Sequence, residues 1–135
     1  TGRVRIECYA SVHDVGRILN PIIVEGQVRG GFAHGFGAAM FEELIYDEDG
    51  NFLSGTFADY LCPTAADLPP VELAHSRTDS PQNSLGSKGM GDGSSMLTPA
   101  VMANAVSDAL DRDDIELPLT LDKLWRLAND GKGQS

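Results

Sequence analysis

Hydrophobic and charged residues alternate near the start of the chain. Val4, Ile6 and Cys8 are separated by arginine and glutamate side chains. A period of two is typical of a half-buried strand, because successive side chains of a strand point to opposite faces. The pattern therefore predicts a strand within residues 3–15.

A long helix is predicted from Pro21 to about Glu43. Asn20 can cap the first free amide groups, and the proline that follows is tolerated at the first helical position. The segment contains five glycines, each of which costs about 1 kcal/mol relative to alanine inside a helix. A stripe with few bulky side chains recurs every four residues, at Gln27, Gly31, Gly35 and Ala39. This face should let another backbone or a flat ligand approach closely, and packing must stabilise the helix.

Short elements are predicted in the middle of the chain. Residues 44–46 and 52–53 should form a hairpin around the acidic turn at 47–51, which offers residues that tolerate turn conformations. That turn lacks the glycine and glutamate at the sixth and twelfth positions of a calcium-binding loop. Two further strands are predicted at residues 56–61 and 71–77.

Two shorter helices are predicted near the end. Thr98 and Pro99 repeat the capping pattern and start a helix that should end near Leu110, and a last helix covers residues 120–129. The first of these is predicted to bury one face, formed by Val101, Ala105, Val106, Ala109 and Leu110. The predicted fold class is α+β, with mixed short strands, a long glycine-rich helix and two shorter C-terminal helices.

The composition fits one domain. A chain of 135 residues with 41% hydrophobic residues can bury a core, so residues 1–130 are expected to form a single domain and residues 131–135 a disordered tail. The chain begins without methionine inside a strand-like pattern. It is therefore expected to be a piece of a longer protein, with proteolytic maturation as the alternative.

Charge and cysteine content narrow the partners. The net charge of -10 argues against nucleic acid, which is bound through clustered lysine and arginine. The apolar runs are shorter than the roughly 20 residues of a membrane helix. Cys8 and Cys62 have no spacing that could build a zinc or iron-sulfur site. The expectation is a reduced cytoplasmic protein with no membrane span, whose partners are proteins and small molecules.

The segment from Ser84 to Ser95 is the most site-like. It holds four glycines, one lysine and one carboxylate directly before a predicted helix. Gly89, Gly91 and Gly93 are expected to adopt backbone torsions that other residues avoid and to point amides at an anion, with Asp92 among them. It matches neither a Walker motif nor a dinucleotide fingerprint. From composition alone, a flexible surface loop with a solvated aspartate is the competing interpretation.

A series of short motifs follows in fixed order over residues 12–119: His13-Asp14-Val15-Gly16-Arg17, Asn20-Pro21, Glu25-Gly26-Gln27, Gly30-Gly31, Gly35, Asp59-Tyr60, Gly86-Ser87-Lys88-Gly89-Met90-Gly91 and Ala103-Asn104-Ala105. Together they resemble the last portion of the molybdenum-cofactor-binding large subunit of the xanthine oxidase, aldehyde oxidase and carbon monoxide dehydrogenase family. The resemblance covers nearly the whole chain.

The resemblance implies a molybdenum-pyranopterin cofactor held through its pterin, so that the protein itself supplies no metal ligand. It places Gln27 against the cofactor through its side-chain amide, and Gly26, Gly89 and Gly91 are expected as further cofactor contacts. The base position of the family, normally glutamate, is Asp92 here. Aspartate is shorter by about 1.5 Å of reach. Asp92 is then a base on a loop moved closer, a base for a differently placed substrate, or part of a degraded site.

The implied activity is hydroxylation of an aldehyde, an N-heterocycle or another small carbon centre, with water as the oxygen source. Carbon monoxide is a less favoured substrate. The remainder of the subunit and partner subunits with iron-sulfur clusters and FAD are expected, and the 135-residue chain alone is expected to be inactive. The alternatives are a non-catalytic paralogue that kept the fold and lost the base, and an independent binding module, which the glycine-rich helix disfavours. His13 and His34 are expected to have packing or hydrogen-bonding roles.

Overall fold

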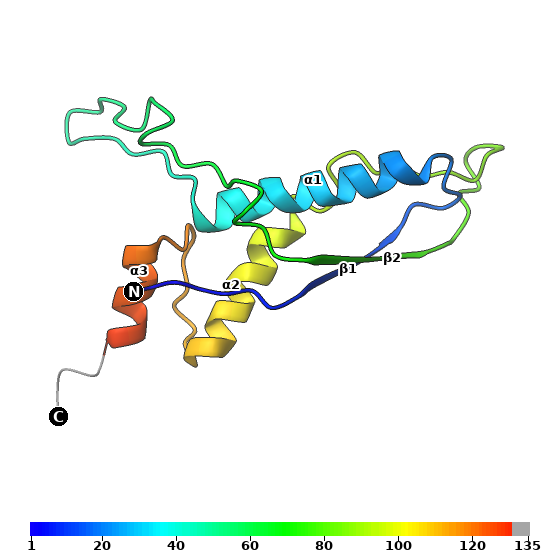
Figure 1. The fold of residues 1–135 in the computed structure, drawn as a ribbon. Coiled ribbons are helices and arrows are strands. Elements are labelled where there is room, and N and C mark those ends of the chain that lie inside the picture. The colour runs from blue at the N-terminus through cyan, green and yellow to red at the C-terminus, as the bar shows by residue number, and fades with distance from the viewer. Residues whose placement is uncertain (131–135) are drawn as a thin grey trace.

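The computed structural model describes residues 1–130, and the tail expected at residues 131–135 lies outside this part. The elements follow in the order β1 (Tyr9–Asp14), α1 (Pro21–Met40), β2 (Val71–Ser76), α2 (Leu97–Leu110) and α3 (Leu121–Asn129). Figure 1 shows α1 as the longest element, with α2 packed across it and the β1–β2 ribbon running alongside. The mixed helix and strand content agrees with the predicted α+β class.

Helix α1 begins where the capping pattern predicts. The Asn20 side chain accepts a hydrogen bond from the Ile23 amide at 3.3 Å, and Pro21 occupies the first turn. The helix ends at Met40, about three residues earlier than expected, because the Phe41 and Glu42 amides both turn back to the Gly37 carbonyl. Val28, Phe32 and Phe36 place its apolar side chains in the core.

Strand β1 pairs in parallel with β2, in a register that matches Tyr9 with Val71 and Asp14 with Ser76. The predicted strand at 71–77 is confirmed to within one residue, whereas β1 is only the second half of the predicted strand at 3–15. The pairing starts late because two prolines, Pro69 and Pro70, precede β2 and cannot donate to a ladder.

The segment between α1 and β2 differs most from the predictions. The expected hairpin is reduced to one antiparallel bridge between Tyr46 and Phe52, whose rings lie 5.3 Å apart. The predicted strand at 56–61 is wrong, since the amides of Asp59 and Tyr60 bond back to the Thr56 carbonyl and form a turn. In Figure 1 this segment, drawn in cyan to green, extends away from the body beyond the end of α1.

Helix α2 begins at Leu97 rather than after a Thr98 cap, and its N-terminal residue makes no side-chain capping bond. Its buried residues are Thr98, Met102 and Val106, so only Val106 of the predicted buried face is fully buried. Val101 is 45% exposed. Helix α2 has apolar residues on two faces, and it packs against α1 through the face that was not predicted.

The core has two parts. Tyr9, Phe32, Phe36, Ala39 and Met102 form one cluster between β1, α1 and α2. The second is smaller and joins Val106 of α2 to Leu119 and Leu124 near the C-terminal end. The first cluster fixes α1 against the start of α2, and the glycine-containing loop that precedes α2 lies along α1 as a result.

Candidate active-site loop

The active-site candidate is the loop of residues 84–95, which rests on the glycine stripe of α1. A Cβ atom at Gly35 would lie 2.6 Å from the Ser95 carbonyl oxygen, and one at Gly31 would lie 3.0 Å from the Ser94 amide nitrogen. Real side chains at these positions would push the loop away. The predicted close approach therefore occurs, and what approaches is the backbone of the loop that carries Asp92.

Gln27 and Asp92, the two main predicted site residues, are in direct contact. The Asp92 amide donates to the Gln27 side-chain oxygen at 3.0 Å, across 65 positions of sequence. Because the amide can only donate, this bond fixes the carboxamide orientation of Gln27 and leaves its NH₂ group directed elsewhere. The structure thus brings together one potential cofactor contact and the carboxylate at the base position.

Asp92 has the unusual backbone conformation of this loop. Its φ of +52° lies in the left-handed region, whereas Gly89, Gly91 and Gly93 are not among the residues with positive φ. The expectation that these three glycines take up the unusual torsions is wrong. Asp92 is held in place because its carbonyl oxygen accepts a bond from the Ser95 hydroxyl at 2.8 Å.

The Asp92 carboxylate turns back along α1. Its Oδ2 lies 3.4 Å from His34 Nδ1, and a Cβ at Gly31 would lie 3.2 Å from its Oδ1. The side chains of His34 and Asp92 are 65% and 54% exposed. This pair was not foreseen in the sequence, where His34 suggested only a packing or hydrogen-bonding role.

Lys88 anchors the other end of the loop. Its ammonium group lies 2.9 Å from Asp14 Oδ2 at the end of β1, and Asp14 also accepts from the Gly16 and Thr78 amides. The hydrogen bond from Lys88, followed by those two amide bonds, holds the pKa of Asp14 well below its usual range. Lys88 is therefore already paired within this chain, and its role is to tie the loop to β1.

A series of buried hydrogen bonds links the loop to α2 and β1. Thr98 donates to the Ser94 carbonyl at 2.8 Å, so the Tyr9 hydroxyl, 3.1 Å away, donates in turn to Thr98. The Ser94 hydroxyl lies 3.0 Å from His13 Nε2. Burial, with a smaller contribution from His75, lowers the pKa of His13 and favours its neutral form. The sequence analysis does not predict these supporting hydrogen bonds of Ser94 and Thr98. Their only signal in the sequence is their position where the loop meets a helix.

The remaining predicted cofactor contacts lie on open surface. Gly26 is exposed next to Gln27, and Gly89 and Gly91 are exposed in the loop. A Cβ at any of these three glycines would meet no atom of the described chain within 4 Å. The Gln27 NH₂ group and the exposed loop backbone at Gly89 and Gly91 are donors of the kind that the polar edge of a pterin accepts. Their contact with the cofactor stays a prediction.

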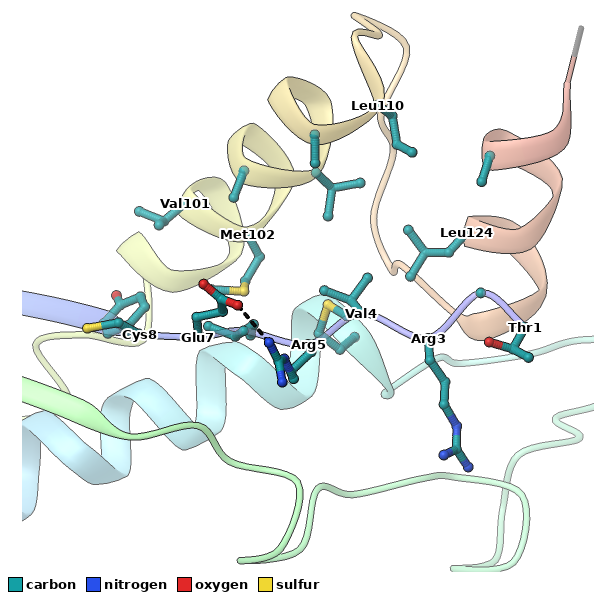
Figure 2. Close-up of a pocket in the computed structure, with 18 residues that line it drawn as sticks. Thr1, Arg3, Val4, Arg5, Glu7, Cys8, Val101, Met102, Leu110 and Leu124 are labelled. Atoms are coloured by element: carbon teal, nitrogen blue, oxygen red, sulfur yellow. Dashed lines mark hydrogen bonds and ion pairs between the residues drawn. The ribbon is translucent and has the colours of Figure 1, made fainter.

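A large apolar groove lies elsewhere. It has a volume of about 660 Å³ and runs between the N-terminal segment and helices α2 and α3, as Figure 2 shows. Val4, Met102, Leu110 and Leu124 lie along it, together with the exposed face of α2. None of the predicted site residues lines this groove, so its size does not make it the active site.

No helix within residues 1–130 is long and apolar enough to cross a membrane. Over the same residues, no group of three or more histidine, cysteine, aspartate or glutamate side chains is arranged to hold a metal ion.

Comparison with known proteins gives one consistent family. Residues 1–69 match the model of the molybdopterin cofactor-binding domain. The large subunit of nicotine 6-hydroxylase from Paenarthrobacter nicotinovorans is 45% identical over 93% of this chain, and the large chain of carbon monoxide dehydrogenase from Afipia carboxidovorans is 36% identical over 94%. The chain covers 16% of the length of each of these relatives.

Solved structures agree with this result. Quinoline 2-oxidoreductase from Pseudomonas putida 86 superposes with a TM-score of 0.83 at 37% identity, covering 90% of this chain and 16% of that one. The copper- and molybdenum-containing carbon monoxide dehydrogenase gives a TM-score of 0.84 at 36% identity, with the same coverage. The chain therefore belongs to the molybdopterin cofactor-binding domains of the xanthine oxidase and carbon monoxide dehydrogenase family.

Proposed function

We propose that this chain is the cofactor-facing C-terminal part of a molybdenum hydroxylase that oxidises a small carbon centre with water as the oxygen source. The observation that carries the proposal is the 3.0 Å bond from the Asp92 amide to the Gln27 side chain. It joins the backbone of the proposed base residue to the side chain of the residue proposed to contact the cofactor. The proposal extends beyond the described residues to the whole subunit.

Each residue has a defined task in this proposal. The NH₂ group of Gln27 donates to the cofactor and orients it, while Gly26, Gly89 and Gly91 allow its close approach. The bound molybdenum-pterin group supplies the redox chemistry. Asp92 accepts the proton of the water-derived nucleophile as general base, a task that requires a carboxylate within hydrogen-bond reach of that proton.

The shorter side chain of Asp92 makes the loop position important. A misplacement near 1 Å can cost on the order of 100-fold in rate. The loop lies directly on the glycine stripe of α1, and the Asp92 amide reaches Gln27. This close seating supports a working base on a loop brought near the cofactor, ahead of a differently placed substrate or a degraded site.

A non-catalytic paralogue is the second candidate, and one observation favours it. Aspartate stands at the position where the family resemblance implies a glutamate. In that case the fold and the cofactor contact persist without proton transfer. The two candidates differ in activity and agree in cofactor content.

The names of the relatives suggest a substrate class to test first. Nicotine 6-hydroxylase and quinoline 2-oxidoreductase are named for N-heterocyclic substrates. We propose an aromatic N-heterocycle as the first class, ahead of aldehydes and carbon monoxide. An electron-poor carbon beside a ring nitrogen suits attack by a water-derived nucleophile.

Partner subunits follow from the electron count. Hydroxylation of a substrate with oxygen from water releases two electrons and two protons, and the electrons need acceptors outside this chain. We propose iron-sulfur and FAD subunits as partners in a cytoplasmic complex, with the remainder of the molybdopterin subunit covering the apolar groove. The isolated chain would then be inactive.

The test uses the complete native subunit in its complex. Molybdenum and pterin content and N-heterocycle hydroxylation are measured for the native form, for Asp92→Glu and for the neutral isostere Asp92→Asn. A working base predicts stoichiometric cofactor in all three forms and loss of activity in Asp92→Asn. Activity only in Asp92→Glu would support the degraded site. Absence of molybdenum and pterin from every form would refute the proposed function.

A further inference from the structure

We propose that His34 is the positioning residue that sets where the Asp92 carboxylate lies. The inference rests on the proposed function of Asp92 and concerns how the base is held. His34 Nδ1 lies 3.4 Å from Asp92 Oδ2, and both side chains are more than half exposed. The sequence analysis predicts only a general packing or hydrogen-bonding role for His34.

The contact between His34 and Asp92 is one of three contacts that Asp92 makes with one face of α1. Gln27, Gly31 and His34 are spaced by four and three residues, so they lie along the same side of the helix. Gln27 accepts from the Asp92 amide at 3.0 Å, and Gly31 leaves room for Oδ1, which would lie 3.2 Å from a Cβ there. The backbone amide and the two carboxylate oxygens of Asp92 thus lie against residues on successive turns of α1.

These three contacts fit the side-chain length of aspartate. The Asp92 amide is fixed by Gln27 and its carbonyl by Ser95, so only the side-chain torsions remain free. His34 restricts those torsions by holding Oδ2. A glutamate would carry its carboxylate up to about 1.5 Å farther from the same backbone and past this contact. His34 should therefore matter for the native aspartate and much less for a glutamate.

The other supports of the loop do not replace this contact. Lys88, which lies four residues before Asp92, is paired with Asp14. Ser94 and Thr98 hold the backbone through the buried chain to Tyr9. These contacts place the loop, whereas the direction of the carboxylate depends on His34 and on the space above Gly31. Removal of the imidazole should therefore release the carboxylate without unfolding the loop.

The experiment compares His34→Ala with His34→Asn in the complete subunit within its complex. Asparagine is the matched control because its amide nitrogen can occupy the place of Nδ1. Crystal structures of both variants give the position of the Asp92 carboxylate, and steady-state kinetics give kcat and KM. We expect the carboxylate to leave its place over Gly31 in His34→Ala. We also expect kcat to fall roughly 10-fold with KM unchanged, within the loss that a misplaced group can cause. His34→Asn should retain both.

Repeating His34→Ala in the Asp92→Glu background tests the selectivity. We expect the loss in kcat to shrink to less than about 3-fold there, because glutamate passes the contact. An unmoved carboxylate in His34→Ala, or an equal loss in His34→Ala and His34→Asn, would overturn the inference. Failure of the proposed function gives a different result, because the crystal structures report the carboxylate position even if the complex hydroxylates nothing.

Discussion

Replacing Gly35 by alanine should weaken the packing of α1 against the active-site loop. The new Cβ would lie 2.6 Å from the Ser95 carbonyl oxygen and 2.7 Å from Thr98 Cβ. Both neighbours resist movement, because one is backbone and Thr98 is fully buried. Ordinary contact would require a shift of about 1 Å, and such overpacking costs about 1–3 kcal/mol.

The opposing effect is helix propensity. Alanine gains about 1 kcal/mol over glycine inside a helix, so the net loss of stability at Gly35 should be roughly 1 kcal/mol. Gly30 is the matched control, because it lies in the same helix and a Cβ there would meet nothing within 4 Å. Gly30→Ala should gain up to about 1 kcal/mol. The two variants should thus differ by roughly 2 kcal/mol.

Amide hydrogen exchange of α1 in the complete subunit measures this difference as a local opening free energy. A difference of about 2 kcal/mol corresponds to exchange about 30-fold faster in Gly35→Ala than in Gly30→Ala. Equal protection in the two variants would show that the loop does not rest on the glycine stripe. The reasoning about the close approach would then be refuted.

Three further predictions concern the supports of the site. Phe32→Ala should cost about 3–5 kcal/mol, because Phe32 is 1% exposed and packs against Tyr9; thermal denaturation of the subunit would measure it. Thr98→Val should cost about 1–3 kcal/mol by leaving the Tyr9 hydroxyl unpaired, which exchange of α2 amides would show. The pKa of Asp14 is lowered from 3.8, chiefly by Lys88. Its stabilising contribution should therefore be present above about pH 4 and be lost as the pH falls further. Asp14→Asn should make exchange across residues 78–90 faster and less dependent on acid.

Local signals in the sequence predicted the elements that depend on local bonds. The Asn20 cap and Pro21 placed the start of α1 correctly, because the capping bond spans three residues. The strand predicted at 56–61 was wrong because local hydrogen bonds also determine the structure there. Bonds from Asp59 and Tyr60 to the Thr56 carbonyl close a turn there, and a pattern of apolar residues does not reveal that competition.

Tertiary choices were less accessible. Helix α2 has two apolar faces, and the sequence favoured the one that lines the groove over the one with Met102 that meets α1. At the site, the motifs identified Gln27 and Asp92, and the stripe predicted a close approach. The contact between these two residues and the turn of the carboxylate toward His34 depend on the loop backbone, which no local pattern determines.

The left-handed backbone of Asp92 changes how its replacement should be interpreted. Its φ is +52°, a region that aspartate and asparagine tolerate better than glutamate, at a cost of about 1–2 kcal/mol for an ordinary side chain. Asp92→Glu therefore places a conformational cost on this backbone as well as extending the side chain. Asp92→Asn keeps the backbone preference and removes only the proton acceptor, so it isolates proton transfer.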